Sequence, residues 1–302
     1  MQLQRARQTL WRVAKFGQTV YSELAPFSKP RFGTGQVHNQ AKMLSFLRRR
    51  LALCSPMGRS TRRAVSIFGS FTVASLATAH CATENSVGQT RLVLPNIDYT
   101  KPMFDSNDIT IIFVLGGPGA GKGTQCKLLT EKYPEFEHIS AGDLLREERN
   151  SPNSMYGDLI NRCIADGAIV PFEITISLLQ KAIKKSGKCK FLIDGFPRAI
   201  DQGEAFERAV CKGSAVIFYD CPFDVLEKRL MKRGQSSGRV DDNIESIRKR
   251  FVTFTETTVP VVKHYEKQGI VHVIDSSLST GQVFLRSCEI IDTIVKSDAN
   301  HN

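Results

Sequence analysis

The chain has 302 residues, and its hydrophobic and charged fractions of 41% and 24% are ordinary for a globular protein. Its net charge of +11 is uneven: residues 1–104 hold 15 basic and 3 acidic residues, and residues 105–302 hold 26 and 27. The body of the chain is therefore nearly neutral, which argues against a general nucleic-acid-binding protein. The eight cysteines form no CxxC pair and have no histidine at zinc-ligand spacing. This predicts free thiols in a reducing compartment, without a disulfide framework or a structural metal.

Residues 1–104 are predicted to form a basic N-terminal extension. Residues 1–63 contain 13 Lys or Arg, one acid and an amphipathic start, which is the composition of a mitochondrial presequence. Residues 64–82 form an apolar run whose length is marginal for a membrane span. Any contact with a membrane is expected only through this run. Residues 80–106 are interpreted as a polar linker. We expect a mitochondrial protein if translation starts at Met1; the alternatives are a disordered basic tail or a gene model that begins upstream of the true start.

Residues 105–302 are predicted to form one α/β domain. Short apolar runs predict strands at 111–115, 138–140, 190–193, 215–220 and 271–274. Amphipathic segments predict helices at 121–132, 141–149, 154–166, 172–185, 201–211, 223–232, 243–267 and 280–296. Apolar strands that alternate with helices indicate a parallel sheet covered on both faces.

A glycine-rich loop follows the first strand, with the sequence Gly116-Gly-Pro-Gly-Ala-Gly-Lys122-Gly-Thr124. The G-x-x-x-x-G-K frame between a strand and a helix is typical of a phosphate loop, whose backbone N–H groups and lysine bind the phosphates of a nucleotide. The hydroxyl residue comes one position later than usual, after Gly123. The predicted ATP-binding residues of the loop are Gly117, Pro118, Gly119, Ala120, Gly121, Lys122, Gly123 and Thr124.

Three further stretches carry motifs: Ser140-Ala-Gly-Asp-Leu-Leu-Arg146, Phe191-Leu-Ile-Asp-Gly-Phe-Pro-Arg198-Ala-Ile-Asp-Gln202, and the segment from Arg229 to Arg250 with Ser-Ser-Gly-Arg-Val-Asp-Asp-Asn-Ile-Glu-Ser. Together with the phosphate loop they resemble the adenylate kinase superfamily of nucleoside monophosphate kinases, and the last stretch is most similar to fungal-type uridylate–cytidylate kinases. The resemblance covers residues 110–297. It implies a P-loop NTPase fold with a five-stranded parallel sheet, a mobile helical insertion for the nucleoside monophosphate (NMP) at about 140–170, and a short zinc-free lid at about 233–243.

The resemblance implies transfer of the γ-phosphate of ATP·Mg²⁺ to UMP, CMP and dCMP, with AMP as a secondary acceptor. The nearly neutral body, which has no long apolar surface pattern, favours a monomer. An adenylate kinase, with AMP as the main acceptor, stays an alternative, as does a mitochondrial protein that binds nucleotide without catalysis. The family also offers the cytoplasm and nucleus as an alternative location.

Phosphoryl transfer needs cations that hold donor and acceptor in line. The predicted catalytic residues are Lys122, Arg198, Arg233, Arg239 and Arg250. Arg198 follows the carboxyl end of a strand, where open α/β sheets bind ligands, and is assigned to the acceptor phosphate. Arg233 and Arg239 flank the lid. Asp194 ends a buried strand and is predicted to hold Mg²⁺ through water, the alternative being a capping carboxylate.

The resemblance supplies the remaining roles. It assigns acceptor binding to Ser140, Arg146, Val170, Gly195, Arg198, Gln202, Arg239 and Arg250, and it places Arg233 and Leu278 with the ATP. The amide of Gln202 can pair with a base edge. Many pyrimidine-specific relatives carry Asn at this position and adenylate kinases carry Gln, so Gln202 favours some use of AMP.

Overall fold

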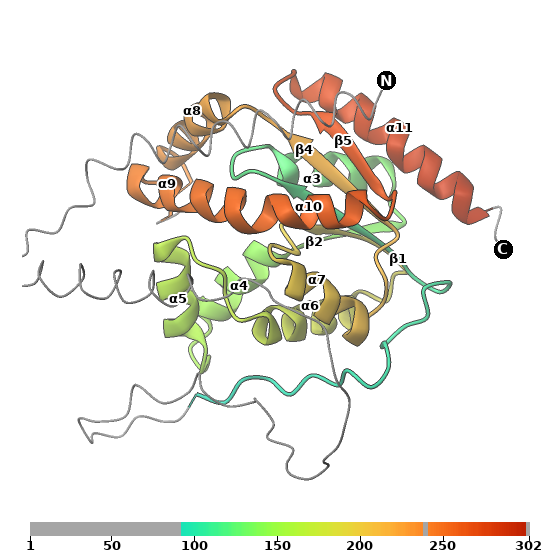
Figure 1. Cartoon of the computed structure of the whole chain (residues 1–302), viewed down its shortest axis with the longest axis horizontal. Coiled ribbons are helices and arrows are strands. Elements are labelled where there is room, and N and C mark those ends of the chain that lie inside the picture. The colour runs from blue at the N-terminus through green and yellow to red at the C-terminus, as the bar shows by residue number, and fades with distance from the viewer. Residues whose placement is uncertain (1–91, 238–240, 300–302) are drawn as a thin grey trace, which may run out of the picture. The chain divides into compact units, whose positions relative to one another are not determined.

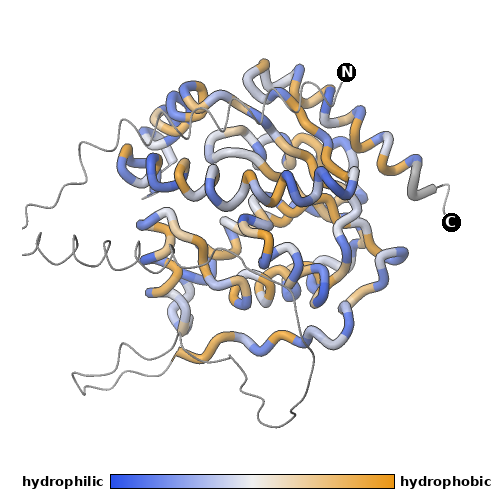
Figure 2. Tube along the Cα trace, viewed as in Figure 1, coloured by the Kyte–Doolittle hydropathy of each residue, from blue (hydrophilic) through white to orange (hydrophobic). Residues whose placement is uncertain are grey.

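The computed structural model describes residues 92–237 and 241–299. Its centre is a sheet of five parallel strands in the order β2-β3-β1-β4-β5 (Figure 1). The strands are β1 (Thr110–Gly116), β2 (Phe136–Ser140), β3 (Lys190–Asp194), β4 (Ala215–Asp220) and β5 (Val271–Asp275). Each contains one of the predicted strands, so the predicted fold class is confirmed. Figure 2 shows hydrophobic residues gathered along the strands and the inward faces of the helices.

Helices cover both faces of the sheet. One face carries α3 (Lys122–Lys132) and α11 (Thr280–Ala299), which contact each other. The other carries α6 (Phe172–Ser186), α7 (Ile200–Ala209) and α10 (Val259–Glu266). There the rings of Phe113, Phe206 and Tyr265 pack with centroids 5.5 and 5.8 Å from that of Phe113. These buried aromatic contacts hold helices α7 and α10 against the central strand.

A smaller apolar cluster holds together the segment that is predicted to bind the NMP, here called the NMP-binding insertion. It is formed by α4 (Ala141–Asn150), α5 (Gly157–Asp166) and the start of α6, through the buried side chains of Leu145, Ile160, Val170 and Ile174. The Oγ of Ser140 accepts a hydrogen bond from the N–H of Asp143 and so caps α4. This cluster is distinct from the main core, although α4 and α6 also pack against the sheet.

The predicted helix 243–267 is interrupted in the structure. It consists of α9 (Ile244–Thr253), a π-helical turn η1 (Phe254–Thr258) and α10, with α8 (Phe223–Gly234) preceding it. Pro260 lies at the start of α10 and has no N–H to donate to the preceding turn. The π turn accommodates this gap, and π turns are frequent at functional sites.

The segment 92–109 packs against the domain. Ile97 is buried in the main core, and the N–H groups of Met103 and Phe104 donate to the carbonyls of Ala209 and Val210 at 3.2 and 2.9 Å. The phenol of Tyr156, next to α5, donates to the carbonyl of Val93 at 3.0 Å. Of the polar linker predicted at 80–106, residues 92–106 lie within the described structure, and there the apolar side chain at position 97 and the paired backbone groups make the segment part of the fold.

Several sequence predictions fall outside the described residues, namely the presequence at 1–63, the apolar run at 64–82, and Arg239. Within the ranges that the structure describes, no helix is both long and apolar enough to span a membrane. The six cysteines in those ranges are all free thiols.

Candidate active site

The phosphate loop connects β1 to α3. Gly119 and Gly121 have φ angles of 87° and 86°, values that favour glycine and that let the loop curl around the N-terminus of α3. The Nζ of Lys122 donates to the carbonyls of Gly116 and Gly117 at 2.9 and 3.0 Å. Burial, together with the charges of Arg198 and Arg250, lowers the pKa of Lys122 to about 8. The loop therefore presents a cation and a helix N-terminus, which is the arrangement that binds polyphosphate.

Asp194 lies beside this loop at the carboxyl end of β3. Its side chain is 12% exposed. A Cβ on Gly123 would lie only 3.3 Å from the Oδ2 of Asp194, so a larger residue after Lys122 would crowd this carboxylate. A carboxylate next to the phosphate loop is a hard oxygen donor of the kind that Mg²⁺ prefers, so this position fits the predicted ion.

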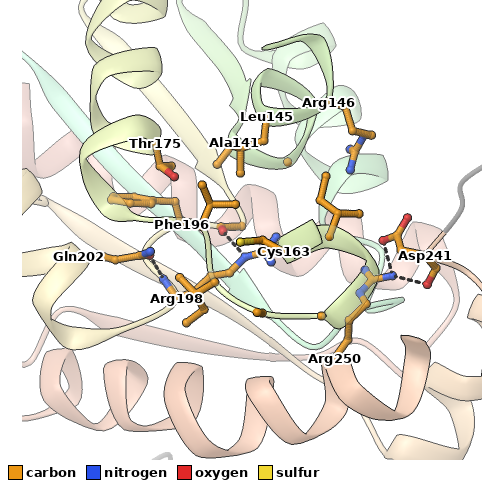
Figure 3. Close-up of a pocket in the computed structure, with 17 residues that line it drawn as sticks. Ala141, Leu145, Arg146, Cys163, Thr175, Phe196, Arg198, Gln202, Asp241 and Arg250 are labelled. Atoms are coloured by element: carbon orange, nitrogen blue, oxygen red, sulfur yellow. Dashed lines mark hydrogen bonds and ion pairs between the residues drawn. The ribbon is translucent and has the colours of Figure 1, made fainter. Parts of the chain in front are cut away.

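A pocket opens between the NMP-binding insertion and the sheet (Figure 3). Arg146 points into it from α4, opposite Arg198 and Arg250. The guanidinium of Arg198 donates through Nε to the carbonyl of Gly195 at 3.1 Å. Burial, followed by the positive charges of Arg250 and Arg146, lowers the pKa of Arg198 to about 10. Like charges placed this close favour an anionic ligand between them.

A second cavity adjoins the phosphate loop. It is lined by Lys122 and Pro118 on one side and by Pro197 and the π turn on the other. Both cavities share the same wall, which is formed by Gly167, Gly195, Arg198 and Arg250. A phosphate bound by the loop and a phosphate bound in the first pocket would therefore meet at two arginines, as an in-line transfer requires.

Gln202 lines the first pocket and is only 3% exposed. Its Oε1 accepts a hydrogen bond of 2.9 Å from the N–H of Arg198. This hydrogen bond uses one lone pair of the amide oxygen and fixes the orientation of the amide, so the NH₂ group is available to donate to a ligand.

The arginines at the lid are held by two buried carboxylates. Arg233, at the end of α8, pairs with Asp242, and Arg250, on α9, pairs with Asp241 at 2.8 Å and with Asp242 at 3.2 Å. In this conformation Arg233 contacts a carboxylate and lines neither cavity, whereas Arg250 lines both. A phosphate that recruits Arg233 has to displace Asp242.

The remaining predicted residues are dispersed. Val170 is buried and lines the first pocket, together with Gly195. Ser140 acts as the N-cap of α4 and lines neither cavity. Leu278 follows β5, is packed on the main core, and likewise lies outside both cavities.

Comparisons with known proteins identify this arrangement. The family model described as adenylate kinase matches residues 114–270. The chain belongs to the adenylate kinase family. It is 53% identical over 178 residues to a uridylate kinase of Saccharomyces cerevisiae, covering 58% of this chain and 87% of the yeast protein. It is 55% identical over 177 residues to a uridylate kinase of Schizosaccharomyces pombe, covering 58% and 93%. It is 50% identical over 190 residues to a UMP-CMP kinase of Xenopus laevis, covering 60% and 98%.

In this adenylate kinase family member, sequence reasoning missed two sets of residues at the site. One is the acid pair Asp241 and Asp242, although both were visible in the lid motif. The other comprises Thr253 and Thr258, whose hydroxyls donate to the carbonyls of Gly167 at 2.8 Å and of Arg198 at 3.2 Å. Threonines within a helix usually bond to their own helix, so no local signal marked these two as contacts to the wall that the two cavities share.

Proposed function

We propose that this chain is a nucleoside monophosphate kinase that transfers the γ-phosphoryl group of ATP·Mg²⁺ to UMP and CMP. The observation that carries the proposal is the wall of Arg198 and Arg250 shared by the phosphate-loop cavity and the acceptor pocket. One cavity suits a polyphosphate and the other suits a monophosphate ester with a base. A binding protein would have no need to bring two phosphates to one pair of arginines.

The chain's own residues supply the charge and the alignment. Lys122 binds the phosphates of ATP, Arg146 and Arg198 hold the acceptor phosphate, and Arg250 stabilises the negative charge between them. Asp194 would hold Mg²⁺, whose role is to neutralise charge on the phosphates and to orient them. Closure of the lid, with Arg233, would exclude the water that competes as an acceptor.

The names of the relatives favour pyrimidine acceptors, because proteins named uridylate kinase and UMP-CMP kinase are 50–55% identical to this chain over the 177–190 residues that align. Gln202 favours AMP as a second acceptor. Its free NH₂ group would donate to a ring nitrogen or a carbonyl oxygen of the base, and both uracil and adenine present such an acceptor. We therefore propose that AMP is used less efficiently than UMP and CMP.

The test is a coupled assay of ADP release by the full chain with ATP·Mg²⁺ and UMP, CMP, dCMP or AMP. We expect turnover led by UMP and CMP. Lys122→Ala is expected to lower kcat by about 100-fold or more, whereas Lys127→Ala, an exposed lysine on the same helix, should match the wild type. Turnover led by AMP would indicate an adenylate kinase. ATP binding without ADP release for every acceptor would indicate a non-catalytic protein.

We also propose that residues 1–104 direct the chain to mitochondria and that the enzyme is a monomer. The concentration of positive charge in residues 1–63 supports the first point. A fluorescent protein fused behind residues 1–104 should enter mitochondria, and a diffuse cytosolic signal would contradict the proposal. Light scattering on the full chain would test the second point.

A further inference from the structure

Cys126, His138 and Asp194 converge beneath the phosphate loop. The thiol, the imidazole and the carboxylate each offer one ligand atom, and these atoms all lie within 4.8 Å of one another. Cys126 lies on α3, His138 lies on β2 and Asp194 ends β3. Cys126 and Asp194 are buried and His138 is half-buried.

The sheet register explains the convergence. Ser140 of β2 pairs with Asp194 of β3, and His138 comes two residues before Ser140. Side chains two residues apart on a strand point to the same face, so His138 and Asp194 are diagonal neighbours on one face. Helix α3 contacts β2 and β3 on that face and brings Cys126 to both.

The imidazole of His138 has an unsatisfied nitrogen within the described part of the chain. Its Nε2 is buried and forms no hydrogen bond there, and it lies 3.5 Å from the Oδ2 of Asp194. This separation is longer than an ordinary hydrogen bond. Buried polar atoms nearly always have a partner, and a metal ion is one partner that an imidazole nitrogen accepts. The orphaned nitrogen therefore points to a ligand between His138 and Asp194.

The three groups are of the chemical kinds that bind zinc. Sulfur, imidazole nitrogen and carboxylate oxygen bind Zn²⁺ at about 2.0–2.3 Å, so tetrahedral ligand atoms lie about 3.3–3.7 Å apart. The observed 3.5 Å between Nε2 and Oδ2 falls within that range. We propose that Cys126, His138 and Asp194 form a site for Zn²⁺ or another thiophilic divalent cation, with a fourth position left for water.

Occupation of this site would oppose catalysis. The inhibitory part of the proposal rests on the proposed kinase function, because Asp194 would serve both Mg²⁺ and the thiophilic ion. An ion bound to Asp194 withdraws the carboxylate from Mg²⁺ and links α3 to β2 and β3. Because an ion there competes with Mg²⁺ for Asp194, the site is suited to inhibition by free zinc.

The test titrates the full chain with Cd²⁺ and follows the ultraviolet thiolate-to-metal charge-transfer band, which does not depend on turnover. Cys126→Ala removes the sulfur ligand, and His138→Gln removes the imidazole. Cys189→Ala is the matched control, since Cys189 is an exposed free thiol outside the cluster. We expect each of the first two changes to weaken Cd²⁺ binding by about tenfold or more, while the control leaves it unchanged. Circular dichroism verifies that each variant is folded, and Cys126→Ser replaces Cys126→Ala if the latter is not.

Inhibition is measured separately, as the Zn²⁺ concentration that halves ADP release at fixed Mg²⁺ and ATP. Chelation of zinc by ATP affects all variants equally. The proposal is supported if this half-inhibitory Zn²⁺ concentration rises by about tenfold or more in Cys126→Ala and stays unchanged in Cys189→Ala. A Cd²⁺ band that is unchanged in Cys126→Ala would overturn the site. If Cys126→Ala loses the Cd²⁺ band but is inhibited by Zn²⁺ as strongly as the wild type, the inhibitory role is overturned. If the full chain shows no turnover at all, the proposed kinase function fails while the Cd²⁺ titration still decides the site.

Discussion

Arg233 donates two hydrogen bonds to Asp242, from Nε to Oδ2 at 2.7 Å and from Nη2 to Oδ1 at 2.6 Å. This two-point pair joins the end of α8 to the residues just before α9, across the lid. Ser237 adds a hydrogen bond of 3.1 Å to the same carboxylate, and Arg250 contacts it from α9. The carboxylate of Asp242 therefore pairs with the guanidinium group of Arg233, to which the phosphates of ATP would otherwise bind.

Asp242→Asn should separate these two roles. The amide keeps the shape of the side chain but loses the charge that holds Arg233 and Arg250. We expect the free energy of unfolding to fall by about 1–3 kcal/mol, because two cations lose their buried partner. ATP·Mg²⁺ should bind more tightly, because the arginines have lost a competitor.

Denaturant titration and calorimetry measure these two effects. Glu245→Gln is the control, since the carboxylate of Glu245 is 80% exposed and pairs with Lys249 four residues later on the same helix. That change should alter neither stability nor ATP affinity. Weaker ATP binding by Asp242→Asn at wild-type stability would mean that the pair belongs to the closed, catalytic conformation.

The same pair makes stability depend on pH. Burial alone would raise the pKa of Asp242, but the hydrogen bonds and charge of Arg233 outweigh it and lower that pKa below its ordinary value of 3.8. The folded state then binds fewer protons than the unfolded state at acid pH. The stabilisation is complete above about pH 4 and is lost as the pH falls through the lowered pKa. Below about pH 4 the unfolding free energy of the wild type should fall more steeply than that of Asp242→Asn; equal slopes would contradict the assignment.

Gln202 should control the choice of acceptor. Gln202→Glu replaces the free NH₂ group with an acceptor-only carboxylate, so kcat/KM for every acceptor should fall by about 10- to 100-fold while the KM for ATP stays constant. Gln202→Asn keeps both functions on a shorter side chain and should shift the preference from AMP toward CMP and UMP. Steady-state kinetics with the three acceptors measures the ratio, and an unchanged ratio would remove Gln202 from base recognition.

Gly167 should be essential for the position of Arg250. It has a φ of +63°, and a Cβ on it would lie 3.0 Å from the backbone nitrogen of Arg250. Gly187 has a φ of +68° with nothing within 4 Å, so Gly187→Ala carries the backbone strain without the contact. The backbone strain alone should cost each variant about 1 kcal/mol of stability, and the contact in Gly167→Ala adds to that cost. Only Gly167→Ala should also lower kcat, and equal kcat values in the two variants would contradict this reasoning.

The segment 92–104 should contribute to the stability of the domain. Ile97→Ala removes a side chain that is 8% exposed and should cost about 2 kcal/mol, whereas Val93→Ala, at 64% exposed, should be within about 0.5 kcal/mol of the wild type. A chain that begins at residue 92 should have a higher Tm than one that begins at residue 105, because the latter uncovers the core. Equal Tm values would mean that the domain begins after residue 104, as the composition indicated.

Contiguous residues determined most of the fold. The three central strands β1, β3 and β4 coincide with apolar runs, because a strand buried on both faces needs an apolar residue at nearly every position. The edge strands β2 and β5 are less apolar and contain Glu137, His138 and His272. The phosphate loop was equally clear from the sequence, since its glycines and Lys122 act within one turn of chain. Composition was a poorer guide at 92–104. There one buried isoleucine and a few backbone hydrogen bonds join a polar segment to the domain, and neither leaves a periodic signal.

Tertiary structure alone decided which side chains meet. The sequence contained Arg233, Arg250, Asp241 and Asp242 in one motif, but only the folded lid shows that the carboxylates hold the arginines. The amide orientation of Gln202 follows from its contact with the backbone of Arg198. The spacing of the cysteines and histidines predicted no metal site, and Cys126, His138 and Asp194 are separated by 12 and 56 residues. Strand register and the packing of α3 bring them together, and register is set by pairing between distant segments, which no local spacing encodes.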